Sequence, residues 1–150
     1  MKLPEQIRRR FQSYGRQGGQ VRAARMGAEA RRTSARRAAT ARWVRVRFGE
    51  ASFQELGVPG GDLVDVGLAD LAAGKTTLES LLLSLAAPRL QREGVPMGSV
   101  QSDPEQRLYD LLSESEGDLA HARYGAYLRQ VVSFADSLRM YRLPRGRRAS

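Results

Sequence analysis

The sequence predicts an all-α fold: a small domain of short helices with a long C-terminal helix, preceded by a basic helical arm. Apolar residues recur at the three- and four-residue spacing of a helical face in residues 63–73, 76–90 and 118–142. The two-residue alternation of a strand is confined to WVRVRF at 43–48. Glycine and proline separate the periodic segments, so we expect helices joined by loops and little or no sheet.

The charge is divided along the chain. The net charge is +9, yet residues 1–48 hold fourteen Lys or Arg against two acids, whereas residues 49–136 hold six against fourteen. Five arginines follow in the last fourteen residues. This segregation predicts a basic arm over 1–48, a helical domain over 49–142 and a basic tail over 143–150. A chain of 150 residues has room for one modest core.

The arm is predicted to contain two helical stretches. PEQIRRRFQSY (4–14) is typical of a short helix with Pro4 in its first position and Gly15 as its stop. Three glycines in GRQGGQ (15–20) favour a flexible joint. Helix-forming residues then dominate from Val21, and Gly49 follows the last helical residue, Phe48.

Short helices are predicted next. Asp62 is placed to cap a helix that Gly74 ends, and Thr76 with Glu79 has the spacing of a capping box before a leucine-rich helix. Pro88 is expected to kink that helix or to restart it. After a loop at 94–103, Asp103 and Pro104 are typical of a cap and a first helical residue.

The last helix has the longest apolar stripe. Its members alternate by four and three, and they are Tyr124, Leu128, Val131, Ala135 and Leu138. Such a stripe requires another helix beside it. A homo-oligomer formed through this helix is one way to supply that neighbour.

Two motifs suggest a phosphate-binding loop and a histidine-based metal or catalytic site, but neither motif has all the residues that such a site needs. AAGKTT (72–77) has the end of a phosphate-binding loop, but Ala69 stands where that loop needs its first glycine, and the preceding segment is helical rather than a strand. His121 has Asp118 and Tyr124 one turn away on either side, but a single histidine without cysteine cannot build the usual metal shell. We therefore expect no catalytic residue, no metal and no cofactor, and no enzyme.

The stretch RRTSARRAATARWVRVRF (31–48) has seven arginines and no acid. On a helical wheel of about 100° per residue, Ala35, Ala39 and Val46 share one narrow face, and arginines surround most of the rest. Alanine permits close approach to a groove, and the arginines repel one another unless anions lie along the helix. The expected nucleic-acid-binding residues are Arg16, Arg22, Arg25, Arg31, Arg32, Arg36, Arg37, Arg42, Arg45 and Arg47.

A family resemblance adds to this reading. GRQGGQVRAARM (15–26) and EARRTSARRAATARW (29–43) resemble segments of small basic bacterial proteins. VPGGDLVDVGLADLAAG, SLLLSLAAPRLQREGVP and DLAHARYGAYLRQVVSFAD resemble companion proteins of bacterial toxin–antitoxin operons, notably those beside nucleotidyltransferase-like toxins. The resemblance implies an antitoxin that caps a toxin's active site and binds its own operator. It assigns no functional residue.

Two functions remain open. The first is an antitoxin-type adaptor, whose acidic body occupies the basic channel of a protein partner while the arm binds operator DNA. The expected partner-binding residues are Trp43, Phe48, Glu55, Asp62, Asp65, Asp70, Tyr124 and Tyr127. The alternative is a stand-alone nucleic-acid-binding protein, nucleoid-like or RNA-associated, whose affinity falls steeply with salt regardless of sequence.

The composition also indicates a compartment. There is no cysteine, the first residues lack the apolar core of a secretory signal, and the longest apolar run, LLLSLAA at 81–87, is far shorter than the roughly 20 residues that span a bilayer. The alanine-rich face of the arm offers too little apolar area to hold a membrane surface. We expect a cytoplasmic protein that does not bind membranes.

Overall fold

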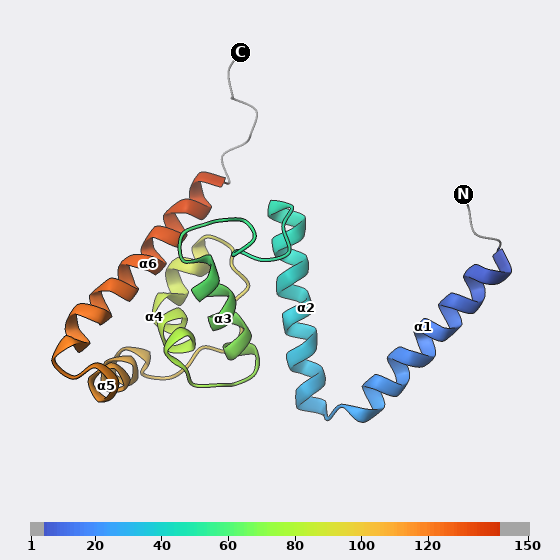
Figure 1. Cartoon of the computed structure of the whole chain (residues 1–150), viewed down its shortest axis with the longest axis horizontal. Coiled ribbons are helices and arrows are strands. Elements are labelled where there is room, and N and C mark those ends of the chain that lie inside the picture. The colour runs from blue at the N-terminus through green and yellow to red at the C-terminus, as the bar shows by residue number, and fades with distance from the viewer. Residues whose placement is uncertain (1–4, 142–150) are drawn as a thin grey trace, which may run out of the picture. The chain divides into compact units, whose positions relative to one another are not determined.

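The structure, a computed structural model, describes residues 5–141, apart from the side chains of residues 8, 11 and 23. Within this range the chain is helical and has no strand, which confirms the all-α class. The elements are α1 (Glu5–Arg25), α2 (Ala28–Phe48), α3 (Gly61–Ala72), α4 (Leu78–Arg92), α5 (Pro104–Glu116), the 3-10 turn η1 (Gly117–Leu119) and α6 (Ala120–Tyr141) (Figure 1). The helix start expected at Pro4 and the basic tail over 143–150 lie outside the described residues.

The chain divides after Ala35 into two compact units, and each is described by itself. In the first unit, α1 passes without a break through Gly15, Gly18 and Gly19, so the flexible joint expected at 15–20 is wrong. Each glycine costs about 1 kcal/mol relative to alanine in a helix, but it keeps its N–H and therefore the hydrogen-bond ladder. The break falls later, at Met26–Gly27, between α1 and α2.

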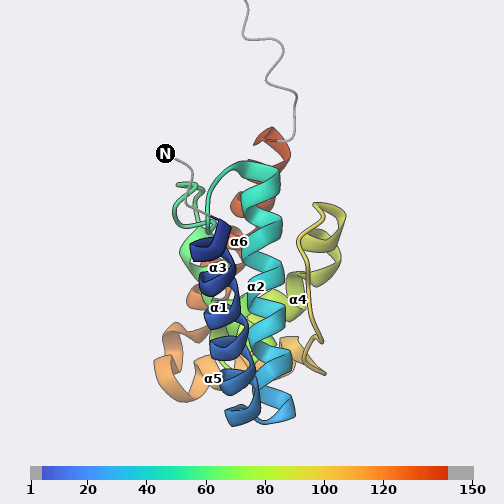
Figure 2. The same ribbon diagram turned by 90° about the vertical axis from the view of Figure 1, so that its right-hand side faces the viewer.

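The second helix is continuous to Phe48, as Figure 2 shows, so WVRVRF is helical. Val44 is 1% exposed, whereas Val46, two positions later, is 80% exposed. Residues two apart lie on the same face of a strand, so this difference is that of a helix. Gly49 follows with φ +85° and donates its N–H to the carbonyl of Arg45 at 2.9 Å. The stop predicted at Gly49 is confirmed.

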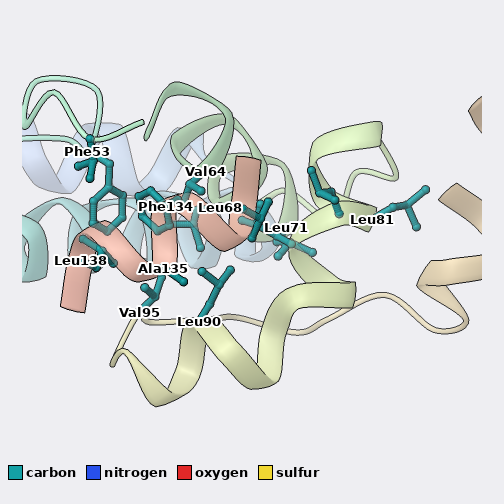
Figure 3. Close-up of a cluster of buried hydrophobic side chains, with 14 of the residues drawn as sticks. Phe53, Val64, Leu68, Leu71, Leu81, Leu90, Val95, Phe134, Ala135 and Leu138 are labelled. Atoms are coloured by element: carbon teal, nitrogen blue, oxygen red, sulfur yellow. The ribbon is translucent and has the colours of Figure 1, made fainter. Parts of the chain in front are cut away.

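The second unit, from Arg36 onward, is built around α4, which packs against α3, α5 and α6. The buried side chains meet in one cluster, part of which Figure 3 shows, with Phe53, Phe134 and Leu138 at one end and Leu81 at the other. Val44 of α2 belongs to this cluster. The unit therefore begins within α2, before the boundary expected at residue 48, because burying Val44 ties the second half of that helix to the core.

The contact between α3 and α4 is close at Gly67. A Cβ atom built there would lie 2.8 Å from both δ-methyl groups of Leu83 and 2.9 Å from the carbonyl oxygen of Glu79. Only a residue without a side chain permits this separation. A glycine inside an otherwise good helix is thus explained by packing.

The helix caps differ in detail from those expected. The capping box of α4 is formed by Thr77 and Ser80, one residue later than the Thr76–Glu79 pair: Thr77 Oγ1 accepts from the Ser80 N–H at 3.2 Å, and Ser80 Oγ accepts from the Thr77 N–H at 2.8 Å. Thr77 has the extended dihedrals that are typical of an N-cap whose side chain accepts a backbone hydrogen bond. Gly60, not Asp62, caps α3, and Asp62 lies in its first turn.

The restart expected at Pro88 is wrong, whereas the start expected for α5 is confirmed. Helix α4 continues through Pro88 to Arg92 as one element, and Asp103 and Pro104 take the cap and first positions of α5. Asp103 adopts a left-handed φ of 46° and makes no side-chain capping hydrogen bond.

The apolar stripe of α6 finds its neighbours inside the chain. Val131, Ala135 and Leu138 are buried, and Tyr124 and Leu128 are partly buried against the same core. Helices α4 and α5 supply the contacts. Because these positions are already covered, an oligomer formed through α6 would need a different face, and it stays a prediction.

Candidate nucleic-acid interface

Helix α2 has an inner and an outer face over residues 36–48. Thr40, Val44 and Phe48 recur every four residues and are buried or partly buried. On the opposite side, Ala39 and Val46 are exposed, as is Ala35 one turn before this segment. The narrow alanine face expected to approach a partner is therefore the face that α2 presents to solvent.

Arginines flank this outer face on both sides. By helical periodicity, Arg42 and Arg45 lie along one edge of the alanine strip and Arg36 and Arg47 along the other. All four are exposed, and within residues 5–141 none of them pairs with a carboxylate. Arg31 and Arg32, in the first half of α2, are likewise exposed and without an ion pair in that range. The charges are thus available to anions outside the chain.

Two arginines of α2 have additional surroundings. The guanidinium carbon of Arg47 lies 5.9 Å from the centre of the Trp43 ring, a cation–π distance. Arg37 points to neither edge of the outer face: with Asp65, Val44 and Leu68 it lines a cavity of about 180 Å³. Arg37 is the expected nucleic-acid-binding residue of α2 that the structure separates from the others.

The arginines expected from α1 belong to the other unit. Arg16, Arg22 and Arg25 are exposed, and within the described residues none has an ion pair. Arg22 and Arg25 border a shallow hollow with Tyr14 and Val21, whereas Arg16 does not.

The aromatic residues of the arm anchor α2. Trp43 and Phe48 pack edge-on at a ring separation of 5.5 Å, and both contact Phe53, at 6.2 and 6.1 Å. Phe53 in turn meets Phe134 of α6 at 4.9 Å, and Phe48 meets Tyr141 at 6.4 Å. Such pairs stabilise by about 1 kcal/mol beyond the area they bury. Trp43 and Phe48, expected to bind a partner, lie in this intramolecular cluster.

The sequence reading missed Phe53, the centre of the cluster, which is fully buried. Its burial could have been predicted from SFQEL, because a large apolar residue in a loop, here the one after Gly49, often packs against the core.

Asp65 organises the loop that follows α2. Its carboxylate accepts the N–H of Phe53 at 3.1 Å and that of Gln54 at 2.8 Å. Burial raises the pKa of Asp65, and the neighbouring Asp62 and Glu55 add to the rise, while the two hydrogen bonds oppose it. This carboxylate therefore helps to position Phe53 from within the chain.

The other expected acidic residues have separate places. Asp70 accepts a hydrogen bond from Thr77 Oγ1 at 2.8 Å, which links α3 to the start of α4. Glu55 Oε2 accepts the N–H of Ala51 at 3.2 Å, but the side chain is exposed. Asp62 is exposed in the first turn of α3.

Tyr124 lies in a different region from these acids. Its hydroxyl donates to Glu105 at 3.5 Å, and its ring meets Tyr109 at 6.0 Å. Burial and the Glu105 charge raise the pKa of Tyr124. Tyr124 and His121 line one hollow of the surface, together with Glu105 and Asp103. Asp118 does not line this hollow. Tyr127 is partly buried against the core.

Neither a metal centre nor a membrane span emerges from the described part of the chain. Between residues 5 and 141, no three side chains of His, Asp or Glu gather closely enough to hold a metal ion. No helix in that range has both the length and the apolar character needed to cross a bilayer.

Fold and site together define a small all-α protein that carries an arginine-lined helix anchored to a helical core. Comparison of the chain with protein-family models, with curated proteins and with solved structures finds no match in any of the three.

Proposed function

We propose that this protein binds nucleic acid through the outer face of α2, as the DNA-binding part of an antitoxin-type adaptor. One observation carries the proposal: Arg36, Arg42 and Arg45 stand exposed beside an alanine strip, with no carboxylate partner among residues 5–141, and the opposite face of the helix is buried or partly buried. A helix of 21 residues is about 32 Å long, close to one turn of duplex DNA.

The aromatic cluster favours duplex over single-stranded nucleic acid. Single-strand binders stack bases on exposed aromatic rings. In α2 the two candidate rings, Trp43 and Phe48, are engaged with Phe53. What remains outward is alanine, valine and arginine, which suits contact with phosphates and a groove.

The test is binding of a fluorescent DNA duplex, measured by anisotropy across a range of salt concentrations. Replacing Arg36, Arg42 and Arg45 by glutamine should weaken binding and reduce the slope of log affinity against log salt by about one per lost phosphate contact. The matched control removes the same charge elsewhere, by replacing the exposed residues Lys75, Arg129 and Arg139. Equal losses for both triple variants would contradict the proposal.

Arginine substitution is preferable to deletion of the arm. Removing residues 1–48 would also remove Val44 from the core and Trp43 and Phe48 from the aromatic cluster. A loss of binding in that deletion would not separate nucleic-acid contact from folding.

The adaptor role adds a protein partner, for which a nucleotidyltransferase-like toxin is the proposed class. Charge segregation supports it: the exposed acids Glu55 and Asp62 lie in a segment, residues 49–136, that complements a basic substrate channel. The role is binding rather than catalysis, requires no cofactor, and is exercised in the cytoplasm.

Co-expression with a candidate nucleotidyltransferase-like toxin tests the adaptor role. Glu55→Lys with Asp62→Lys should abolish co-purification and protection from toxicity, while Asp110→Lys with Glu114→Lys, a matched exposed pair on α5, should preserve both. The alternative, a stand-alone nucleoid-like or RNA-associated protein, predicts recovery with nucleic acid and no partner after nuclease treatment.

A further inference from the structure

One face of α1 carries large apolar side chains that its own unit leaves uncovered. Ile7, Tyr14 and Val21 follow one another at intervals of seven residues, so they lie along the same side of the helix. Their exposed fractions are 41%, 66% and 52%. Every side chain of α1 that the structure describes is exposed. The stripe has the form of a helix–helix contact without its second helix.

A hollow interrupts this stripe at Gly18. Tyr14, Val21 and Met26 form its apolar border, and Arg22 and Arg25 form its charged border. None of the atoms that the structure describes lies within 4 Å of the place where a Cβ atom of Gly18 would stand. A side chain from a second helix could enter there, as a knob enters a hole in a coiled coil.

Helix α1 is also poorly stabilised by its own residues. Gly15, Gly18 and Gly19 all lower helix propensity, and for none of them does a nearby side chain explain the absence of a Cβ atom. Isolated helices are marginal in water, and most helical stability in proteins comes from packing an amphipathic face. Covering the stripe would supply that packing.

The charge of α1 indicates which kind of molecule covers its apolar stripe. The segment of α1 contains six arginines and one acid, Glu5, which pairs with Arg9 at 2.7 Å within the helix itself. A second copy of α1 would bring like charges together. Nucleic acid would meet the arginines but leave Ile7, Tyr14 and Val21 in water. An acidic helix that presents a ridge of small apolar residues satisfies both the stripe and the arginines beside it.

We propose that α1 is a docking helix for an acidic partner protein, which places an apolar side chain over Gly18 between Tyr14 and Val21 and its carboxylates near Arg22 and Arg25. The site does not depend on nucleic-acid binding by α2. It gives the arm two tasks, one for each helix.

The experiment uses the full chain and synthetic amphipathic helical peptides, with binding measured by calorimetry. The probe peptide has an alanine and leucine ridge flanked by glutamates. One control peptide has lysines in place of the glutamates, and the other has serines in place of the ridge. Only the probe peptide should bind, and Tyr14→Ser with Val21→Ser should weaken it by about tenfold or more, the usual effect of removing interface anchors. The matched control, Val100→Ser, removes a valine of similar exposure, 48% against 52% for Val21, from another part of the chain.

Gly18→Leu gives the sharpest outcome. Leucine raises helix propensity but fills the hollow, so helix content should increase while peptide binding is lost. Unchanged or tighter binding by Gly18→Leu, equal binding of the lysine peptide, or protection of Tyr14 by a DNA duplex or by anionic lipid vesicles instead of the peptide would overturn the proposal. The Arg36, Arg42 and Arg45 variant should keep peptide binding, so failure of the α2 interface and failure of the α1 site are distinguishable.

Discussion

Replacing Gly67 by alanine is expected to destabilise the protein, although alanine is the better helix former. The substitution gains about 1 kcal/mol of helix propensity. Against this gain, the new Cβ atom would lie 2.9 Å from the backbone oxygen of Glu79 and 2.8 Å from two methyl groups of Leu83. Leu83 is fully buried, so its side chain cannot relieve the contact by turning into solvent. Overpacking of this kind costs about 3 kcal/mol, which leaves a net loss near 2 kcal/mol.

Thermal unfolding followed by far-UV circular dichroism measures the effect. A loss of about 2 kcal/mol lowers Tm by roughly 10 °C in a domain of this size. The matched control is Gly15→Ala in α1, where no atom of the described residues lies within 4 Å of the added atom. If Gly67→Ala unfolds at the same Tm as the parent or above it, the close approach of α3 and α4 is not a constraint on the fold.

Three further predictions concern local interactions. Gly15→Ala should increase helix content without lowering Tm, since it gains propensity and meets no neighbour; a decrease in helix content would count against a continuous α1. The raised pKa of Asp65 means that the stability it contributes is present below the unfolded value of 3.8 and is lost as pH rises through the folded pKa. NMR titration of this carboxyl should give a midpoint above 3.8, and a midpoint at or below it would contradict the burial argument. Thr77→Ala should lower the free energy of unfolding, measured in urea, by about 1 to 2 kcal/mol, because it removes the cap of α4 and the hydrogen bond to Asp70. Thr76→Ala should lower it by less. A larger loss for Thr76→Ala would indicate that Thr76 is the cap.

The helices themselves were predictable because they depend on local patterns. The stripe of α6 and the stop at Gly49 follow from periodicity and from the conformational freedom of glycine. The errors were local as well. The glycine composition at 15–20 predicts a joint, yet the hydrogen-bond ladder tolerates glycine, and α1 continues. Thr76 and Thr77 are adjacent hydroxyl residues, and their letters alone do not tell which one is extended.

The candidate interface was predictable in its residues but not in its geometry. The arginines and the alanine face of 31–48 are visible on a helical wheel. That Trp43 and Phe48 face inward depends on Phe53 and Tyr141, which contact these rings only in the folded chain, and on Phe134, which packs against Phe53. A helical wheel does not show which of two faces is buried when the residues that pack on that face are distant in the sequence.

The sequence by itself determined the helical class, the segregation of basic and acidic residues, and the arginines that no nearby acid can neutralise, because spacing and charge are properties of neighbouring residues. Only the tertiary structure decided which face of α2 is buried, that Asp65 is occupied with the backbone of Phe53 and Gln54, and that the stripe of α6 is covered from within. The reason is that burial and hydrogen-bond partners are set by segments that meet only when the chain folds.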